Sequence, residues 1–255
     1  YIYLCMYSQN NHLKNQLKIW MLILLGFITL IILVGGLTRL TDSGLSITTW
    51  ELLVGLIPPL SNSKWIEYFN LYKQIPEYNE QNFNMTLNEF KIIFWWEWGH
   101  RQLGRLIGLL VLLPLIFFTM KYGIKILKKY GIIFILVSLQ GFIGWYMVSS
   151  GLADRIDVSH YRLSVHLVTA FIILSIVFWN FLELTNLKIN PISFKLFYIK
   201  FFIVLLFLQL IVGAFVSGMN AGTIYNTWPL MGSSYFPDDS KFSEILNIYV
   251  FDNPS

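Results

Sequence analysis

Two residues with complementary chemistry, Glu97 and His100, lie three positions apart in one apolar stretch, and His166 opens a later apolar stretch. A spacing of three places side chains on one helical face, about a turn apart. Ionisable side chains are costly inside a membrane, so their presence there indicates function. Two imidazoles from neighbouring helices at one depth provide axial ligands for a heme iron, and a carboxylate nearby can accept a proton or stabilise positive charge. These residues therefore predict heme chemistry.

Each of these side chains also has a simpler interpretation. A histidine near a membrane interface is usually a polar residue among lipid headgroups, and His160, six residues from His166 and off its helical face, fits that description better. Glu97 is alternatively an interfacial carboxylate paired with Arg101, four residues further on. The coincidence of the Glu97–His100 pair with a second histidine favours a site.

The helix that carries Glu97 and His100 has recognisable features at its start and along its length. Thr86 followed by Glu89 has the spacing of a capping box, which predicts that the helix begins there, before the apolar residues. Gly104 and Gly108 continue the face of the pair and predict a groove in which a flat molecule approaches the backbone. Pro114 predicts a kink deeper in the helix.

Arginines fall at the predicted outer ends of the helices. A guanidinium group binds a carboxylate through two parallel hydrogen bonds, so heme propionates are suitable partners. Lipid phosphates, Asp154 and Asp157 are equally suitable partners for any one arginine. The candidates are Arg39, Arg101, Arg105, Arg155 and Arg162.

The elements that must position these residues are membrane-spanning helices. The chain has 255 residues, 56% hydrophobic and 13% charged, whereas soluble domains carry about a quarter charged residues. About 20 apolar residues cross a bilayer as a helix. The predicted fold class is all-α, a polytopic transmembrane helical bundle. Because the chain starts at Tyr1 and stops where a further span is due, we interpret it as a fragment. The predicted spans are 19–40, 93–120, 132–150, 163–182 and 196–219, with a sixth beginning after 245.

The distribution of charge predicts the orientation of the spans. Lysines gather in the amino-terminal tail and in the connections 121–131 and 183–195, whereas the long segment 41–92 is acidic. The positive-inside rule then places the amino terminus and those connections inside, with 41–92 and 151–162 outside. A net charge of +4 held in such connections indicates a lipid bilayer as partner and no nucleic acid. The single cysteine, Cys5, excludes an internal disulfide and a CxxC site.

An internal repeat organises the chain. A shift of 178 residues aligns 33–52 with 211–230, where six of twenty positions match and Asp42 faces Asn220. Both segments leave the membrane on the same side, which indicates a parallel repeat of a four-helix module. We predict a tail at 1–18, on the cytoplasmic or matrix side, and a first four-helix module at 19–182 with the outer loop 41–92. The start of a second, truncated module follows at 196–255.

Four long motifs resemble the heme A synthases of mitochondria and proteobacteria, and the resemblance extends over nearly all of the chain from about residue 18. The subgroup of that family with a cysteine pair in the first outer loop is excluded, because 41–92 contains no cysteine. The motifs are GGLTRLTDSGLSITTWELLVGLIPPL at 35–60, EFKIIFWWEWGHRQLGRLIG at 89–108, DRIDVSHYRLSVHL at 154–167 and VGAFVSGMNAGTIYNTWPLM at 212–231.

The resemblance implies an enzyme, an oxidoreductase that converts the C8 methyl group of heme O to the formyl group of heme A, for cytochrome oxidase. Two successive hydroxylations would give a geminal diol that loses water. The resemblance assigns catalysis to Glu97 and axial ligation of heme O or heme A to His100 and His166. A heme b is expected in a second half beyond Ser255, so the chain alone need not be active. The implied partners are heme O synthase and an electron donor, and the implied location is the bacterial or mitochondrial inner membrane, with the amino terminus inside.

Three other classes of protein remain as alternatives. A non-heme di-iron membrane oxidase also uses an ExxH pair, but it needs several carboxylates, and Glu183 lies at the opposite end of its span from Glu97. A transport protein would continue its polar residues across the membrane, whereas here they cluster near the outer face. A b-type cytochrome that only carries electrons has no need of a carboxylate one turn from a ligand, so Glu97 is the discriminating residue.

Overall fold

The computed structural model describes residues 2–50, 54–154, 156–185, 196–224, 227 and 229–235. Arg155, Trp228 of the repeat motif and the expected sixth span lie outside the described residues. The regular elements among the described residues are helices, with no strand, as predicted. The elements are α1 (Ile2–Leu40), the 3-10 turn η1 (Val54–Leu56), α2 (Asn62–Tyr72), α3 (Pro76–Glu80), α4 (Leu87–Tyr122), α5 (Ile124–Asp154), α6 (His160–Thr185), α7 (Leu196–Gly218) and the 3-10 turn η2 (Ala221–Thr223).

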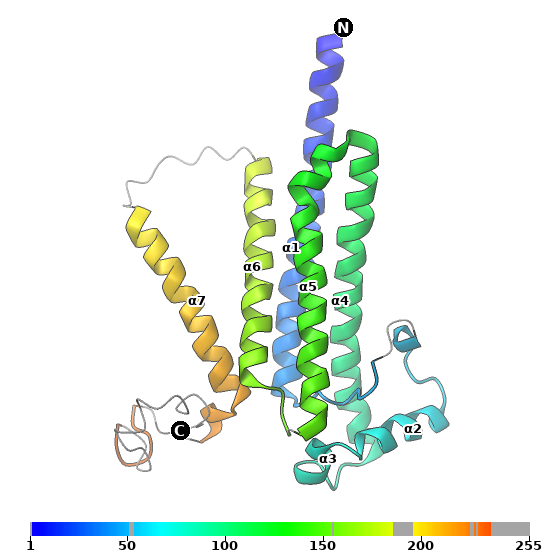
Figure 1. The fold of residues 1–255 in the computed structure, drawn as a ribbon, viewed down its shortest axis with the longest axis vertical. Helices are drawn as coiled ribbons and strands as arrows, with labels where there is room; N and C mark the ends of the chain where they lie inside the picture. Colours follow the sequence, from blue (N-terminus) through cyan, green and yellow to red (C-terminus); the bar gives the residue numbers. More distant parts are fainter. Residues whose placement is uncertain are drawn as a thin grey trace.

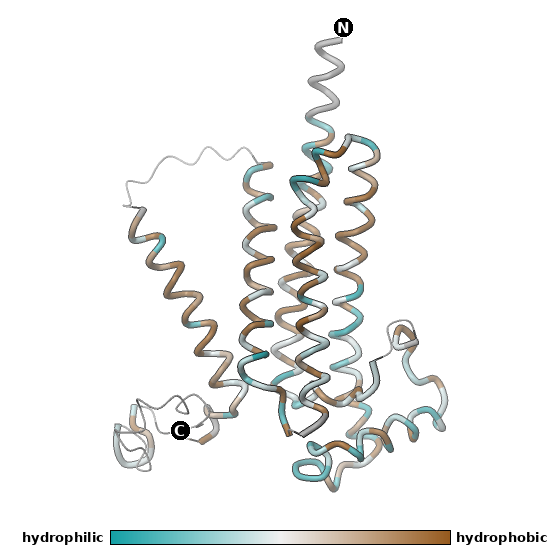
Figure 2. The backbone as a smooth tube through the Cα atoms, in the orientation of Figure 1, coloured by the Kyte–Doolittle hydropathy of each residue, from teal (hydrophilic) through white to brown (hydrophobic). Residues whose placement is uncertain are grey.

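The prediction of five membrane-crossing helices in the described part of the chain is confirmed. Five helices are long and apolar enough to cross a bilayer, and Figure 2 shows that hydrophobic residues dominate their length. α1 is helical well before the apolar run begins, so it continues without a break through the tail predicted at 1–18. The five spans are Asn11–Leu40, Leu87–Tyr122, Ile124–Leu152, His160–Thr185 and Phe197–Gly218.

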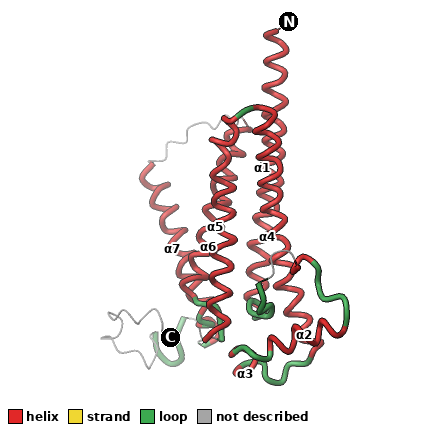
Figure 3. The backbone as a smooth tube through the Cα atoms, turned by 45° about the vertical axis from the view of Figure 1, so that its right-hand side comes forward, coloured by secondary structure: helices red, strands yellow, loops and turns green. Residues whose placement is uncertain are grey.

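Four of these helices form a closed bundle. α1 packs between α4 and α6, and α5 completes the ring by packing against the same two helices (Figure 1). α7 packs against α6 at its carboxyl-terminal end, whereas its amino-terminal end lies away from the other helices. Figure 3 shows this from a second side. Gly123, with a φ of +93°, ends α4 and lets the chain reverse at once into α5.

The capping box of α4 is formed as predicted. Glu89 N–H donates to Thr86 Oγ1 at 3.4 Å, and Thr86 N–H donates to Glu89 Oε2 at 2.7 Å. The helix therefore begins at Leu87 and adds turns before the predicted start of the span at 93. It then runs unbroken through Pro114 to Tyr122.

The long loop between α1 and α4 folds back onto the start of α4. α2 and α3 lie at the end of the bundle where α1 ends (Figure 1), and they enclose a second small core with the first turns of α4. Tyr72 and Phe90 at the centre of this core are fully buried. Tryptophans add to this contact, since Trp95 contacts Trp65 of α2 and Trp98 of its own helix.

The ends of α1 and α7 show that the repeat extends to the backbone. α1 ends at Leu40 and α7 ends at Gly218, which are equivalent positions in the 178-residue alignment. Two residues further on, Asp42 and Asn220 both adopt the left-handed conformation, with φ values of 46° and 54°. A non-glycine residue with positive φ is uncommon. The same rare turn at equivalent positions is therefore independent support for the duplication.

Candidate functional site

The bundle encloses a large cavity near the end where α2 and α3 lie. Its volume is about 820 Å³, toward the upper end of the roughly 300–1,000 Å³ of typical ligand pockets. Its walls are mostly apolar, from α1, α4, α5 and α6, with residues of α3 and α7 at the rim. Of the seven predicted site residues that the structure describes, six line this one cavity: Glu97, His100, His166, Arg39, Arg101 and Arg105.

His100 is held against α1. Its Nδ1 lies 3.2 Å from Thr38 Oγ1, and that hydroxyl donates its own proton to the main-chain oxygens of Val34 and Gly35, at 2.7 and 3.0 Å. The hydroxyl therefore accepts from Nδ1–H, which leaves Nε2 as the nitrogen with a free lone pair. An ideal Cβ at Gly35 would lie only 3.1 Å from His100 Cε1. Glycine at this position is what lets the ring lie against α1.

His166 is held against α5 in a similar way. An ideal Cβ at Gly144 would lie 3.0 Å from His166 Cε1, so a glycine again provides the space for the ring. One turn earlier on α5, Gln140 Nε2 donates to the main-chain oxygen of His166 at 2.9 Å. Each histidine of the pair thus packs against a glycine of a neighbouring helix, and the pair faces one cavity.

Glu97 is a buried and well-oriented carboxylate. Its Oε2 accepts from the Ser46 hydroxyl and from the Ile47 main-chain N–H, both at 2.7 Å, and its Oε1 accepts from Arg101 Nη2 at 2.5 Å. The pairing with Arg101 that the simpler interpretation expected is thus present. The residue is only 4% exposed and forms part of the cavity wall.

Arg101 and Arg105 join α4 to the loop that follows α1. Arg101 Nη2 donates to the Ile47 main-chain oxygen at 2.9 Å, and Arg105 Nη1 donates to that of Gly55 at 3.3 Å. Both residues also line the cavity. Their guanidinium groups therefore stabilise the segment that covers Glu97 and at the same time give the cavity wall positive charge.

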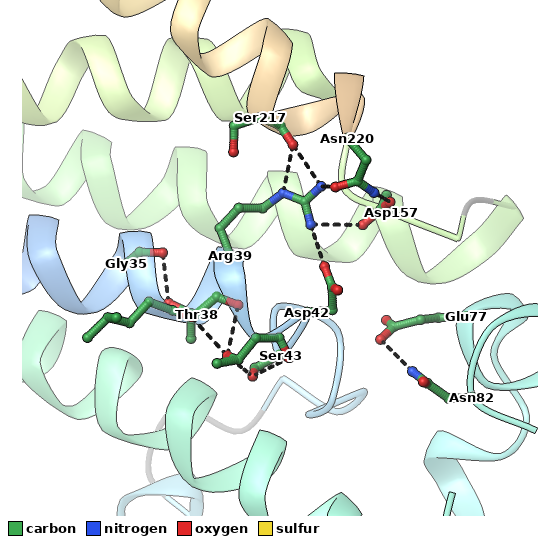
Figure 4. Close-up of polar contacts among 12 residues, drawn as sticks. Gly35, Thr38, Arg39, Asp42, Ser43, Glu77, Asn82, Asp157, Ser217 and Asn220 are labelled. Atoms are coloured by element: carbon green, nitrogen blue, oxygen red, sulfur yellow. Dashed lines mark hydrogen bonds and ion pairs between the residues drawn. The ribbon is translucent and has the colours of Figure 1, made fainter. Parts of the chain in front are cut away.

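Arg39 is at the centre of a polar cluster at the cavity rim (Figure 4). Its Nη1 donates to Asp42 at 2.7 Å and to Asp157 at 3.3 Å, and its Nη2 donates to the Ser217 main-chain oxygen at 2.8 Å and to Asn220 Oδ1 at 2.7 Å. Burial raises the pKa of Asp157 even though the Arg39 charge acts to lower it. The cluster joins the ends of α1 and α7 to the segment before α6. Asp157 is thus a partner of Arg39, as the alternative to propionate binding anticipated.

Three residues considered in the sequence analysis, Arg162, His160 and Gly108, are not part of this cavity lining. Arg162 donates to Tyr146 Oη at 3.2 Å and stacks over that ring, on the α5–α6 surface. His160 is 5% exposed and packs against Tyr161 and Phe215, so it is a buried contact between α6 and α7. Gly104 lines the cavity, whereas Gly108, predicted to extend the groove, lies outside the described lining.

Glu77 on α3 is a site residue that sequence reasoning missed. It is 3% exposed and lines the cavity rim, and its Oε1 accepts from Tyr72 Oη at 3.0 Å and from Asn82 Nδ2 at 3.4 Å. Burial raises the pKa of this carboxyl to about 8. In Figure 4 Glu77 points toward the cluster around Arg39. Nothing in the local sequence distinguishes it from the exposed acidic residues of the same loop.

Thr38, Gly35, Gly144 and Gln140 were also missed as neighbours of the histidines. Thr38 and Gly35 belong to the motif at 35–60, but their relation to His100 depends on how α1 faces α4. Glu183, the carboxylate weighed for a di-iron site, pairs with Lys129 at 2.8 Å, far along α6 from His166. The described residues contain no group of three or more histidine, cysteine or acidic side chains placed to hold a metal ion.

Fold and site together define the class of this protein: a polytopic helical membrane protein whose bundle encloses a cavity lined by two histidines and a buried carboxylate. The family model described as cytochrome oxidase assembly protein matches residues 18–255. A heme A synthase of Pelagibacter ubique is 48% identical over 250 residues, which cover 97% of this chain and 74% of the relative.

Further relatives agree with that match. A heme A synthase of Maricaulis maris is 49% identical over 88% of this chain and 67% of its own length. One of Agrobacterium fabrum is 45% identical over 94% of this chain and 67% of its own length. No solved structure matches. The chain belongs to the heme A synthase family of cytochrome oxidase assembly proteins.

Proposed function

We propose that this chain carries the substrate site of a heme A synthase, in which heme O binds between α4 and α6 and its C8 methyl group is oxidised to a formyl group. The observation that supports the proposal best is that Glu97, His100 and His166, selected from the sequence as one site, line the same cavity. The family relationship supports the same activity.

The residues present fit a heme. Axial ligation needs a neutral imidazole whose second ring nitrogen is hydrogen-bonded, and Thr38 provides that partner for His100. The macrocycle is apolar and flat, and the cavity wall is mostly apolar with glycines at the positions where the histidine rings pack. His100 and His166 would hold the iron, and the iron when bound supplies the redox chemistry.

Glu97 is proposed as the residue that acts on the reacting edge of the substrate. Three donors fix both carboxylate oxygens, so the group faces the cavity without needing to reorganise. Such a preorganised charge stabilises positive charge that develops at an oxidised carbon, and the same oxygens can take up a proton released there. An electron carrier would not require this group, which is why Glu97 discriminates between the two functions.

Positive charge at the cavity supports binding of the two heme propionates. Arg105 and Arg101 line the wall, and Arg39 lies at the rim. Arg39 already contacts two aspartates and a main-chain oxygen, so we propose Arg105 as the first propionate partner and Arg39 as a residue that organises the rim. Arg162 lies on the α5–α6 surface and would contribute only indirectly.

The spans make this an integral membrane protein. We propose an inner membrane, with the amino terminus inside and α2 and α3 on the outer side, because the lysine-rich connection between α4 and α5 lies at the opposite end of the bundle (Figure 1). The cavity would then open near the outer surface. Heme O synthase as the source of substrate and a separate electron donor are part of the proposal.

The test replaces Glu97 with Gln in the full-length protein, supplied with heme O. The substitution keeps the size and removes the charge and the proton acceptor, so bound heme should remain while turnover falls by about a hundred- to a thousandfold. Chromatography of extracted hemes measures heme O, hydroxylated intermediate and heme A. Glu67→Gln, at an exposed carboxylate of α2, is the matched control and should convert heme O normally. Normal heme A from Glu97→Gln would contradict the catalytic role.

A further inference from the structure

The two histidines of the cavity have parallel surroundings that differ in one respect. On α1, His100 contacts Gly35 and, three residues further on, Thr38. On α5, His166 contacts Gly144 and, four residues earlier, Gln140. In each case a glycine packs against the ring and a polar residue one turn away bonds to the same histidine, but only His100 has a hydrogen bond at its Nδ1.

Beside His166, one ring nitrogen of the histidine and the side-chain oxygen of Gln140 lack hydrogen-bond partners in the described part of the chain. His166 Nδ1 is buried in the structure and has no hydrogen-bond partner among the described residues. Gln140 Oε1 is likewise buried and lacks a partner in the described part of the chain. Buried polar atoms are nearly always paired, because an unpaired one loses its hydrogen bonds to water without replacement.

The connectivity of the two side chains points to the missing bond. Gln140 Nε2 already donates to the main-chain oxygen of His166 at 2.9 Å, which holds the amide beside this residue. In a side-chain amide the oxygen and the nitrogen share one carbon, so the oxygen lies next to the same histidine. The His166 ring also packs against α5, since an ideal Cβ at Gly144 would lie 3.6 Å from Nδ1.

We propose that Gln140 is the positioning residue of His166, whose amide holds the histidine at two points. Nε2–H donates to the main-chain oxygen, and Oε1 accepts from the ring Nδ1–H when Nε2 of the ring faces the heme iron. The inference rests on the proposed function, because it gives His166 the role of an axial ligand. It assigns to Gln140 the part that Thr38 has for His100, and it fixes the tautomer in which Nε2 carries the lone pair.

The test uses two substitutions that should shift the midpoint potential of the bound heme in opposite directions. Gln140→Glu places a charged acceptor at Nδ1–H, makes the imidazole a stronger donor and should lower the midpoint potential of the bound heme. Gln140→Leu removes the acceptor, should raise that potential and should weaken heme binding by about 10- to 100-fold. Redox titration and heme titration of the purified full-length protein measure both. The signal is assigned to this site by its loss in His100→Ala.

Gln102→Leu is the matched control, since Gln102 is also a span glutamine that donates to a main-chain oxygen, that of Gly55 at 2.8 Å. It should leave the potential unchanged. Equal potentials for wild type and both Gln140 variants would overturn the inference, as would shifts in the same direction. If Gln140→Leu does not fold, the isosteric Gln140→Glu decides alone: a lower potential supports the inference and an unchanged one overturns it. If His100→Ala and His166→Ala leave the heme signal intact, the proposed function itself fails.

Discussion

The two ends of the four-helix bundle use the same helices for different purposes. Toward the end of the bundle away from α2 and α3, large side chains fill the space between α1, α4, α5 and α6, and Trp20, Met21, Leu24, Tyr130 and Ile133 are buried almost completely. Toward the α2–α3 end, the same helices carry glycines and enclose a cavity of about 820 Å³. The closed half holds the helices together and the open half has space for a ligand.

The difference lies in which residues face inward. The helix spacing in the closed half is filled by aromatic and long aliphatic side chains, as in any close-packed interior. In the open half, Gly35 and Gly144 lie where a Cβ would crowd a histidine ring, at 3.1 and 3.0 Å from its nearest atom. A cavity of this kind lacks the contacts of a packed core, so the closed half and the loop core around Tyr72 must stabilise the whole.

Replacing the cavity histidines is expected to have the largest effect on function. His100→Ala or His166→Ala removes one axial bond and should abolish conversion of heme O, measured by chromatography of extracted hemes. His160→Ala should convert heme O at a nearly normal rate, because His160 packs between α6 and α7 outside the cavity lining. Greater loss from His160→Ala than from His166→Ala would mean that the ligand of α6 is misassigned.

Enlarging a residue in the open half and shortening one in the closed half should separate the effect on heme binding from the effect on stability. Gly144→Val places carbon atoms within contact distance of the His166 ring and should weaken heme binding by about 10- to 100-fold while the protein still folds. Met21→Ala leaves a cavity in the closed half, which costs about 2–5 kcal/mol in soluble proteins and less where lipid surrounds the helices.

Heme titration and thermal unfolding of the detergent-solubilised protein measure these two effects. Met21→Ala should lower the unfolding temperature and leave heme affinity unchanged. Gly144→Val should lower heme affinity and leave the unfolding temperature unchanged. Gly26→Ala is the control, since a Cβ there meets no atom within 4 Å. A large loss of heme affinity in Met21→Ala would show that the two halves are not separable.

The smallest expected effect is a dependence of stability on pH at the cavity rim. Burial holds the pKa of Glu77 at about 8, above its ordinary value of 4.5, so the native state binds the proton more tightly than the unfolded state. The stabilisation is present in full below the ordinary pKa and is lost as the pH rises toward 8, by a few kcal/mol at most. The groups acting on this carboxyl are Tyr72, Asn82, Glu97, Asp157 and Asp42.

Thermal unfolding between pH 6 and pH 8.5 measures this dependence. Wild type should lose stability as the pH rises, whereas Glu77→Gln, which is neutral throughout, should lose much less. Glu80→Gln, at an exposed position of the same helix, should behave like wild type. Parallel curves for wild type and Glu77→Gln would show that this carboxyl is not protonated in the folded protein at neutral pH.

Much of the molecule follows from local sequence. Runs of apolar residues determine the five spans, because a bilayer requires the backbone to satisfy its own hydrogen bonds. The Thr86–Glu89 capping box determined where α4 begins. The spacing of Glu97 and His100, with His166, selected the residues of the site, since ionisable groups are costly in a membrane unless they have a purpose.

Only the tertiary structure decided what surrounds those residues. Thr38 and Gly35 reach His100 from another helix. Glu97 receives two of its three donors from a loop about fifty residues away, and Glu77 is brought to the rim by α3. None of these contacts leaves a periodic or local signal, because each depends on how helices distant in sequence face one another. The spacing of residues along one helix can be obtained from the sequence. The residue that each of them contacts across the bundle is determined by how the helices pack.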